Sequence, residues 1–291
     1  MLKNNQIFFK GMPSIRYWRN ESLIHDALKS PYYWWWAYLR LSKDYWWVCQ
    51  RRGIADDARL KAMYRDFGRV YEMTFEEWWE YKGVKLFSEQ VALPKVRELD
   101  GRDIQLSKAV NNFLVLEIPV NLTERTIIKQ VREQLRQHPH REVIRSSSAK
   151  RQLCKLTGIR KDVIEIAYDA WQRQYESRAD PIAYKIGQVK GTKSLYQIGK
   201  DMRLVASCMP QPSDSRDRAA KKVNGMKVAV SRMLQRANNL IENAAIGTFP
   251  LIQLSKEPII WRSTQLSKLE EAVAAGQWRP LFDKDDSLIV P

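Results

Sequence analysis

The sequence has few of the residues that bind metals or form disulfide bonds. Its 291 residues include three cysteines and three histidines. Cys49, Cys154 and Cys208 lie far apart and are odd in number, which is typical of reduced thiols in a cytosol. His138 and His140 flank a proline, and no carboxylate or cysteine cluster lies near them in the sequence, so the spacing matches no zinc site. We therefore expect no metal, no cofactor and a cytoplasmic protein.

Long apolar runs are also missing. No run approaches the roughly 20 residues that a membrane-spanning helix needs. The N-terminus lacks the charged and apolar layout of a secretory signal peptide. The sequence thus predicts a soluble protein without a membrane partner.

Catalytic motifs are absent as well. The sequence has no Gly-rich phosphate loop ending in Gly-Lys-Ser/Thr, no Gly-x-Ser-x-Gly elbow and no dinucleotide fingerprint. Glu117 lies on an expected strand, as an acidic residue does in some nucleases, but no Asp or Glu-x-Lys partner follows at a matching distance. We predict that the protein is not an enzyme.

Positive charge is present in excess. The 49 Lys and Arg outnumber the 33 Asp and Glu, which gives a net charge of +16. Residues 145–240 hold 20 basic and 8 acidic residues (20 − 8 = +12), whereas residues 31–100 hold 12 and 11 (12 − 11 = +1). Such self-repulsion destabilises a compact state unless a polyanion compensates it, and nucleic acid is the commonest polyanion. The alternative is a solvated, merely basic helical domain.

The stretch Ser146–Tyr175 resembles a DNA-binding helix-turn-helix. It predicts a short helix over 149–156, a turn over 157–160 and a longer helix from Lys161 onward. The matching positions are a small residue, a turn glycine and apolar residues after the turn and on the inner face: Cys154, Gly158, Ile159, Ile164 and Ala167. The second helix also carries Asp162, Glu165 and Asp169, which are costly beside phosphates. We expect this hairpin to support a neighbouring DNA-reading helix.

A helix is predicted from about Arg218 to Asn243, after a shorter one over 195–204. At 100° per residue its apolar face contains Val230, Met233, Leu234, Ala237, Leu240 and Ile241. The opposite face carries Ser231, Arg232, Gln235, Arg236 and Asn239. Arg, Gln and Asn match the donor and acceptor geometry of guanine and adenine edges in the major groove. This face is our candidate for reading bases, and a solvated polar face is the alternative.

Cations near both stretches are candidates for phosphate contacts, which give salt-dependent affinity for double-stranded DNA. They are Lys150, Arg151, Lys155, Arg160, Lys161, Lys221, Lys222 and Lys227.

Aromatic residues crowd the N-terminal third. The run Pro31–Leu41, the run Asp44–Cys49, a helix over 59–70 and a capped helix beginning at Thr74 predict a bundle of about three helices. Consecutive aromatics cannot share one helical face, so some must pack inward while others meet a second layer or a partner. Core packing is the plainer interpretation, and stacking on bases or a protein interface is the other. Tyr33, Trp35, Trp36 and Trp47 are the candidates for a protein or homodimer interface.

This aromatic part resembles uncharacterised, regulator-like proteins of proteobacterial prophages and integrated elements. The motifs that carry the resemblance are Pro31-Tyr-Tyr-Trp-Trp-Trp-Ala-Tyr-Leu-Arg40, Tyr45-Trp46, Asp66-Phe67-Gly68, Phe75-x-x-Trp78-Trp79 and the segment near Phe249-Pro250. The resemblance covers about the first 120 residues and implies no catalytic residue.

Between these regions, residues 111–120 predict a strand, and Asn121–Thr123 predict the cap of a helix that ends at Gln137. That helix would turn Ile127, Ile128, Val131 and Leu135 inward. A further helix is expected from residue 263 or 264 to 275. The fold class is therefore mainly α with one or two short strands. The predicted domains are an aromatic helical domain (1–105), a basic domain with helix-turn-helix-like hairpins (106–250) and a C-terminal appendage (251–291).

The function predicted from these features is sequence- or structure-dependent DNA binding in a bacterial mobile element, in regulation, replication or packaging. The alternative is a non-catalytic assembly subunit, such as a phage-type structural or defence-complex protein, that touches nucleic acid without reading its sequence.

Overall fold

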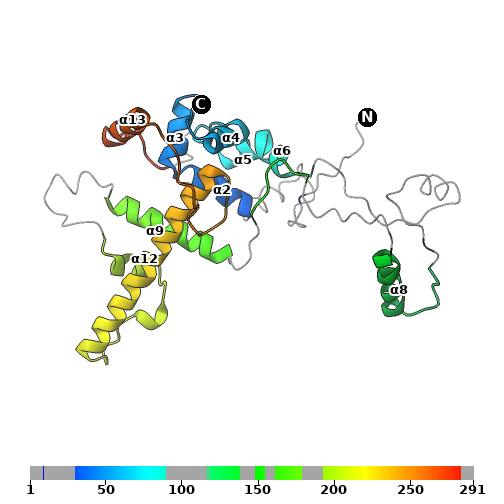
Figure 1. The fold of residues 1–291 in the computed structure, drawn as a ribbon. Helices are drawn as coiled ribbons and strands as arrows, with labels where there is room; N and C mark the ends of the chain where they lie inside the picture. Colours follow the sequence, from blue (N-terminus) through cyan, green and yellow to red (C-terminus); the bar gives the residue numbers. More distant parts are fainter. Residues whose placement is uncertain are drawn as a thin grey trace. The chain divides into compact units, whose positions relative to one another are not determined.

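The computed structural model describes residue 9 and residues 30–89, 116, 118–137, 148–154, 161–178 and 193–282. These residues are mainly helical, as the sequence predicts (Figure 1). The predicted strand falls largely outside them, and its described positions, 116 and 118–120, are not in a strand. The chain divides into two compact units, Met1–Ser88 with Ala149–Pro291 and Glu89–Ser148. This division differs from the predicted boundaries at 105 and 250.

Helix α2 (Pro31–Leu39) is the centre of the first unit. The Ser30 hydroxyl caps it by accepting hydrogen bonds from the amides of Tyr32 and Tyr33. The helix is apolar on every side, and such a helix must be covered on every side. Helices α9 (Lys161–Arg178) and α12 (Arg216–Ile246) contact it. Two buried side chains tie α2 to these helices: the Tyr38 hydroxyl donates to the Ile164 carbonyl at 2.8 Å, and Trp35 Nε1 donates to the Ala244 carbonyl at 3.1 Å.

Three of the four proposed interface aromatics belong to this core. Tyr33, Trp35 and Trp36 are buried inside the first unit, so the prediction that they form a partner interface is wrong. The physical reason is the all-apolar helix itself, which leaves no face for a partner. Trp47 is half-buried and packs beside Trp46 against the C-terminal helix α13 (Ser263–Ala274).

The remaining N-terminal helices complete the aromatic core. They are α3 (Lys43–Gln50), α4 (Ala58–Phe67), α5 (Phe75–Trp78), the π-helical turn η1 (Trp79–Gly83) and α6 (Val84–Phe87). The predicted capping box is present, because the Thr74 hydroxyl accepts from the Glu77 amide and the Glu77 carboxylate accepts from the Thr74 amide. Phe67 and Trp78 stack with their ring centroids 5.1 Å apart.

The first helix of the predicted helix-turn-helix is not formed. Residues 149–154 are non-helical, and their backbone bonds to other parts of the first unit. The Arg151 amide donates to the Leu86 carbonyl at 2.9 Å, and the Cys154 amide donates to the Phe249 carbonyl at 3.0 Å. The predicted turn at 157–160 lies outside the described residues. The second helix of the hairpin is confirmed as α9, with Ile164 and Ala167 buried as predicted.

Helix α12 has 31 residues and contacts α2, α4, α9 and α11 (Leu195–Asp201) of the first unit. Its apolar residues form the predicted face, with Val230, Leu234, Ala237 and Leu240 buried and Met233 and Ile241 half-buried. Its C-terminal end lies in the aromatic core and stops at Gly247, whose φ of 87° suits a left-handed cap. Its N-terminal half extends away from that core, and α11 and the short turn η2 (Ala206–Cys208) pack against it (Figure 1).

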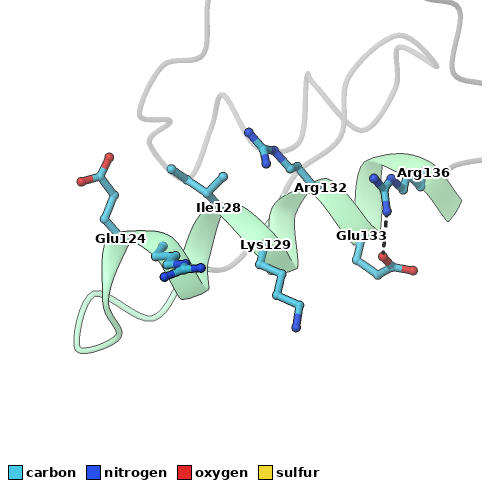
Figure 2. Close-up of a pocket in the computed structure, with 7 residues that line it drawn as sticks. Glu124, Ile128, Lys129, Arg132, Glu133 and Arg136 are labelled. Atoms are coloured by element: carbon cyan, nitrogen blue, oxygen red, sulfur yellow. Dashed lines mark ion pairs between the residues drawn. The ribbon is translucent and has the colours of Figure 1, made fainter.

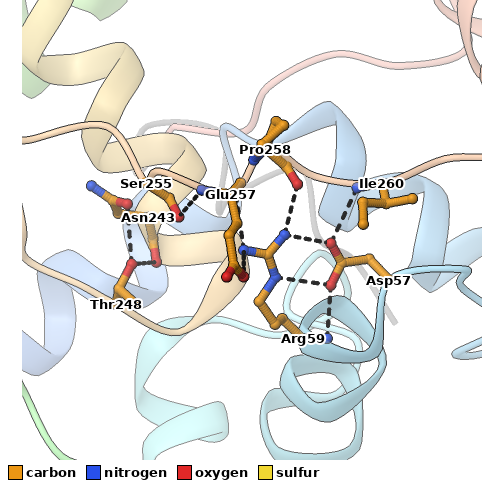
Figure 3. Close-up of polar contacts among 8 residues, drawn as sticks. All are labelled: Asp57, Arg59, Asn243, Thr248, Ser255, Glu257, Pro258 and Ile260. Atoms are coloured by element: carbon orange, nitrogen blue, oxygen red, sulfur yellow. Dashed lines mark hydrogen bonds and ion pairs between the residues drawn. The ribbon is translucent and has the colours of Figure 1, made fainter.

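Residues 251–282 belong to the first unit and are hydrogen-bonded to its helices. The buried Asn243 amide donates to the carbonyls of Leu251 and Gln253 at 2.6 and 2.7 Å. Arg59 donates to the carbonyls of Glu257 and Pro258, as Figure 3 shows. These hydrogen bonds hold the C-terminal segment against α12 and α4.

Within the second unit, the predicted helix is confirmed as α8 (Glu124–Gln137). None of its residues is buried: Ile127, Val131 and Leu135 are half-buried, and Ile128 is 40% exposed. The prediction that Ile128 points inward is therefore wrong. The ends of this unit meet where the Glu89 carboxylate accepts from the Ser148 amide at 2.7 Å and from its hydroxyl at 2.6 Å.

Candidate nucleic-acid interface

The end of the first unit built from α11, η2 and the N-terminal half of α12 is strongly basic. Residues 193–236 are described without a gap and contain ten Lys and Arg against three Asp, a surplus of 10 − 3 = +7. We call this region the basic end. It accounts for a large part of the protein's excess charge.

Two of the three carboxylates of the basic end form ion pairs. Asp214 forms ion pairs with Lys222 at 2.6 Å and with Arg218 at 3.2 Å. The Lys222 hydrogen bond, followed by one from the Gln211 amide, holds the pKa of Asp214 below its usual range. Asp201 pairs with Lys193 at 2.8 Å, and this hydrogen bond lowers the pKa of that carboxyl too. Asp217 is exposed in the first turn of α12, where it complements the helix dipole.

Seven cations of the basic end have no ion-pair partner among the described residues. They are Lys200, Arg203, Arg216, Lys221, Lys227, Arg232 and Arg236. All are exposed apart from Arg236, which is half-buried. Their charge is therefore available to an external anion.

The outward side of α12 presents the candidate reading side chains. Ser231, Arg232 and Gln235 are exposed, opposite the buried Val230 and Leu234. Lys221 lies on the same side as Arg232, about 16 Å away at 1.5 Å per residue. One helical surface thus combines phosphate-type and base-type donors.

The other two reading candidates are engaged within the first unit. Asn239 donates to the Ile252 carbonyl at 2.8 Å, and its side-chain oxygen accepts from Gln235 Nε2 at 3.0 Å. Arg236 Nη1 lies 3.7 Å from Met233 Sδ. Asn239 therefore helps to fasten the C-terminal segment and orients Gln235, which stays at the surface.

The residues predicted to contact phosphates do not form one site: some lie in the basic end, some elsewhere in the first unit, and some outside the described residues. Lys221 and Lys227 belong to the basic end, whereas Lys222 is largely covered by its pairing with Asp214. Lys150 and Arg151 lie elsewhere in the first unit, each 2.7 Å from a carboxylate oxygen of the buried Asp66. Lys155 and Arg160 lie outside the described residues, as does the side chain of Lys161 at the start of α9.

Of the seven cations without an ion-pair partner, sequence reasoning missed three: Lys200, Arg203 and Arg216. Arg216 is the first residue of α12, whereas Lys200 and Arg203 join the surface because α11 packs closely on α12, where a Cβ at Gly199 would lie 2.6 Å from Met226 Cγ. A glycine inside a predicted helix was the available signal, since it marks a close helix contact.

Other kinds of site find no support among the described residues. They contain no group of three or more His, Cys, Asp or Glu side chains placed to hold a metal ion. No helix in the described part is long and apolar enough to cross a membrane. No protein-family model, curated protein or solved structure matches the chain.

Proposed function

We propose that the protein binds duplex DNA through the basic end, with the outward side of α12 facing the major groove. The observation that carries the proposal is the set of seven cations without an ion-pair partner in the described part of the chain, all between residues 200 and 236, with Lys221 and Arg232 on one exposed side of α12. A major groove is wide enough to admit an α-helix. The acids that do occur here are mostly used in folding the basic end.

Two kinds of contact would then have separate roles. Lys221, Lys227 and Arg216 would meet phosphates, which position the protein without reading the sequence. Arg232 and Gln235 would meet base edges, since Arg pairs with guanine and Gln with adenine through two hydrogen bonds. Action in regulation, replication or packaging within a mobile element is part of the same proposal and rests on the resemblance of the aromatic segment.

Selection from random duplex oligonucleotides, followed by affinity measurements across a salt series, tests this function. The double variant Arg232→Ala/Gln235→Ala should relax the selected preference, at about 1–3 kcal/mol for each lost base contact. Lys221→Ala should weaken binding to all sequences alike and reduce the salt slope by about 1.

A matched control is Gln265→Ala/Lys268→Ala on α13, where a glutamine and an exposed lysine also lie three residues apart. It should leave both preference and affinity unchanged. If the α12 double variant selects the same sequences with the same affinity as the wild type, α12 is not the reading helix.

An assembly subunit is the second candidate function, and exposed apolar side chains favour it. Leu254 and Ile260, on the segment fastened across α12 and α4, are 54% and 66% exposed. A partner protein would bury them, and Leu254→Ser/Ile260→Ser should then abolish a complex without changing DNA affinity. Recovery of no selected sequence, together with DNA binding of equal strength to all duplexes, would favour this function.

A further inference from the structure

Helix α8 of the second unit carries a straight row of four cations. Arg125, Lys129, Arg132 and Arg136 are spaced i, i+4, i+7 and i+11. At 100° per residue these positions fall within about 60° of one another, along about 16 Å of helix. We call this row the α8 ridge. The side chains spread from this row: in Figure 2, Lys129 projects to one side of the view with Glu133, and Arg132 projects to the other with Ile128.

The ridge is exposed and little neutralised. All four cations are exposed, and a cavity of about 580 Å³ is lined by them together with Glu124, Ile128 and Glu133. Arg136 approaches Glu133 at 3.8 Å, a long ion pair. Arg125, Lys129 and Arg132 have no ion pair with any described residue.

This arrangement works against the helix that carries it. Successive cations of the ridge are like-charged neighbours, three or four residues apart: Arg125 and Lys129, Lys129 and Arg132, and Arg132 and Arg136. Each such like-charged pair destabilises an isolated helix. The opposite side of the helix holds the uncharged Gln130, Gln134 and Gln137, so the positive charge of α8 is concentrated along the ridge. An external polyanion would relieve the repulsion.

The geometry favours a nucleic-acid backbone over a lipid surface. A helix that lies on a membrane exposes its apolar face and has aromatic or leucine side chains there. In α8 the residues Ile127, Val131 and Leu135 are half-buried, and the helix contains no aromatic residue. A duplex carries one phosphate charge per roughly 1.7 Å of axis, so a ridge of about 16 Å lies beside roughly ten charges.

We propose that the α8 ridge is a second DNA contact, which binds the phosphate backbone of a duplex without reading its sequence. The proposal is independent of the role given to α12, since it concerns the other unit of the chain. A protein with both contacts would take its affinity from two units and its preference from one.

The test uses the full-length chain with Lys129→Gln/Arg132→Gln, in which glutamine keeps a comparable helix propensity. Binding to a random-sequence 30-base-pair duplex is measured from low to moderate salt. Loss of two phosphate contacts should lower the slope of log affinity against log salt by about 2 and weaken low-salt binding about tenfold or more. The sequence preference found by selection should not change. Circular dichroism confirms that the variant keeps its helix content.

The matched control is Lys61→Gln/Lys268→Gln, which removes the same charge from exposed positions on α4 and α13. It should leave the slope unchanged. An equal loss of slope in the control would mean that only net charge matters, and the ridge would not be a site. An unchanged slope in the α8 variant would also overturn the proposal.

Two further results separate the ridge from its alternatives. If the α8 variant loses binding to vesicles containing phosphatidylserine while its DNA binding is intact, the ridge is a lipid contact. If Arg232→Ala/Gln235→Ala changes nothing while the α8 variant lowers the slope, the proposal for α12 fails and that for α8 stands. Absence of salt-dependent binding by the wild type would overturn both.

Discussion

Asp66 forms ion pairs with the segment by which the chain re-enters the first unit after the second unit. It is buried at the end of α4, and its two carboxylate oxygens bind Lys150 and Arg151, which follow directly on the second unit. The Arg151 guanidinium also lies against Gly247, where a Cβ would be 2.9 Å from Nη1. Local patterns could not reveal this, because the carboxylate lies 85 residues away from Arg151 in the sequence.

Replacing this carboxylate by an amide should destabilise the first unit in a pH-dependent manner. Burial alone would raise the pKa of Asp66, but hydrogen bonds from Lys150 and Arg151 lower it below its ordinary value of 3.8. A carboxyl with a lowered pKa stabilises the folded state above its ordinary pKa, and this contribution is lost as pH falls through the folded value. Asp66→Asn should therefore cost about 2 kcal/mol near pH 7 and progressively less below about pH 4.

Thermal unfolding of both proteins between pH 3 and pH 7 measures this difference. The control is Asp169→Asn, which removes a half-buried i,i+4 pair with Arg173 and should cost well under about 1 kcal/mol. A gap between wild type and Asp66→Asn that stays constant down to pH 3 would contradict the assignment.

Among the elements, helices with a strong period and a cap were predictable, and the segment 149–154 was not. Helices α4, α8, α12 and α13 follow from apolar spacing, and the first three also have a side-chain cap, at Asp57, Thr123 and Ser215. Segment 149–154 satisfies a loose helix-turn-helix pattern, yet its amides bond to Leu86 and Phe249. Bonds to distant carbonyls compete with the local helix, and no local pattern contains them.

The close contact between α11 and α12 predicts opposite effects for two helical glycines. At Gly199 a Cβ would lie 2.6 Å from Met226 Cγ and 2.8 Å from the stiff Val230 Cγ2. Gly199→Ala should therefore lose about 1–2 kcal/mol by overpacking. At Gly225 the nearest atom is Cys208 Sγ at 3.0 Å. Gly225→Ala should be neutral or gain up to about 1 kcal/mol of helix propensity.

Denaturant unfolding of the two variants gives the comparison, and DNA affinity provides a second readout. Displacement of α11 by Gly199→Ala should also weaken binding, because Lys200 and Arg203 follow α11 into the basic end. Equal stability of both variants would mean that the α11–α12 contact is looser than described.

For the whole molecule, composition predicted where the charge lies but not how the chain divides. The aromatic N-terminal segment looked self-sufficient, whereas its core is completed by residues more than a hundred positions downstream. Tyr38 bonds to the Ile164 carbonyl, and the Trp35 ring stacks on Phe249 with centroids 5.7 Å apart. The second unit is an insertion with adjacent ends, since Leu86 and Arg151 are joined by a backbone hydrogen bond of 2.9 Å. Sequence spacing alone cannot show that two such distant residues meet.

This division predicts that the second unit can be removed while the first stays folded. A chain in which a short Gly-Ser linker replaces residues 89–148 should unfold cooperatively, because its ends already lie together. All eleven tryptophans lie outside 89–148, so the fluorescence of the folded deletion chain should equal that of the full chain. If α8 and α12 act as proposed, the deletion should keep the DNA sequence preference and lower the salt slope.

The opposite truncation is the control for this prediction. Removing residues 251–291 cuts a segment whose carbonyls are bound by Asn239, Asn243 and Arg59 and whose Trp261 and Phe282 pack against the aromatic core. The truncation leaves the buried amide of Asn243 without its two acceptors, and each lost partner should lower the free energy of unfolding by about 1–3 kcal/mol. This chain should show red-shifted tryptophan emission and no cooperative transition. If it folds while the 89–148 deletion does not, the boundary lies near residue 250 and the insertion is part of the core.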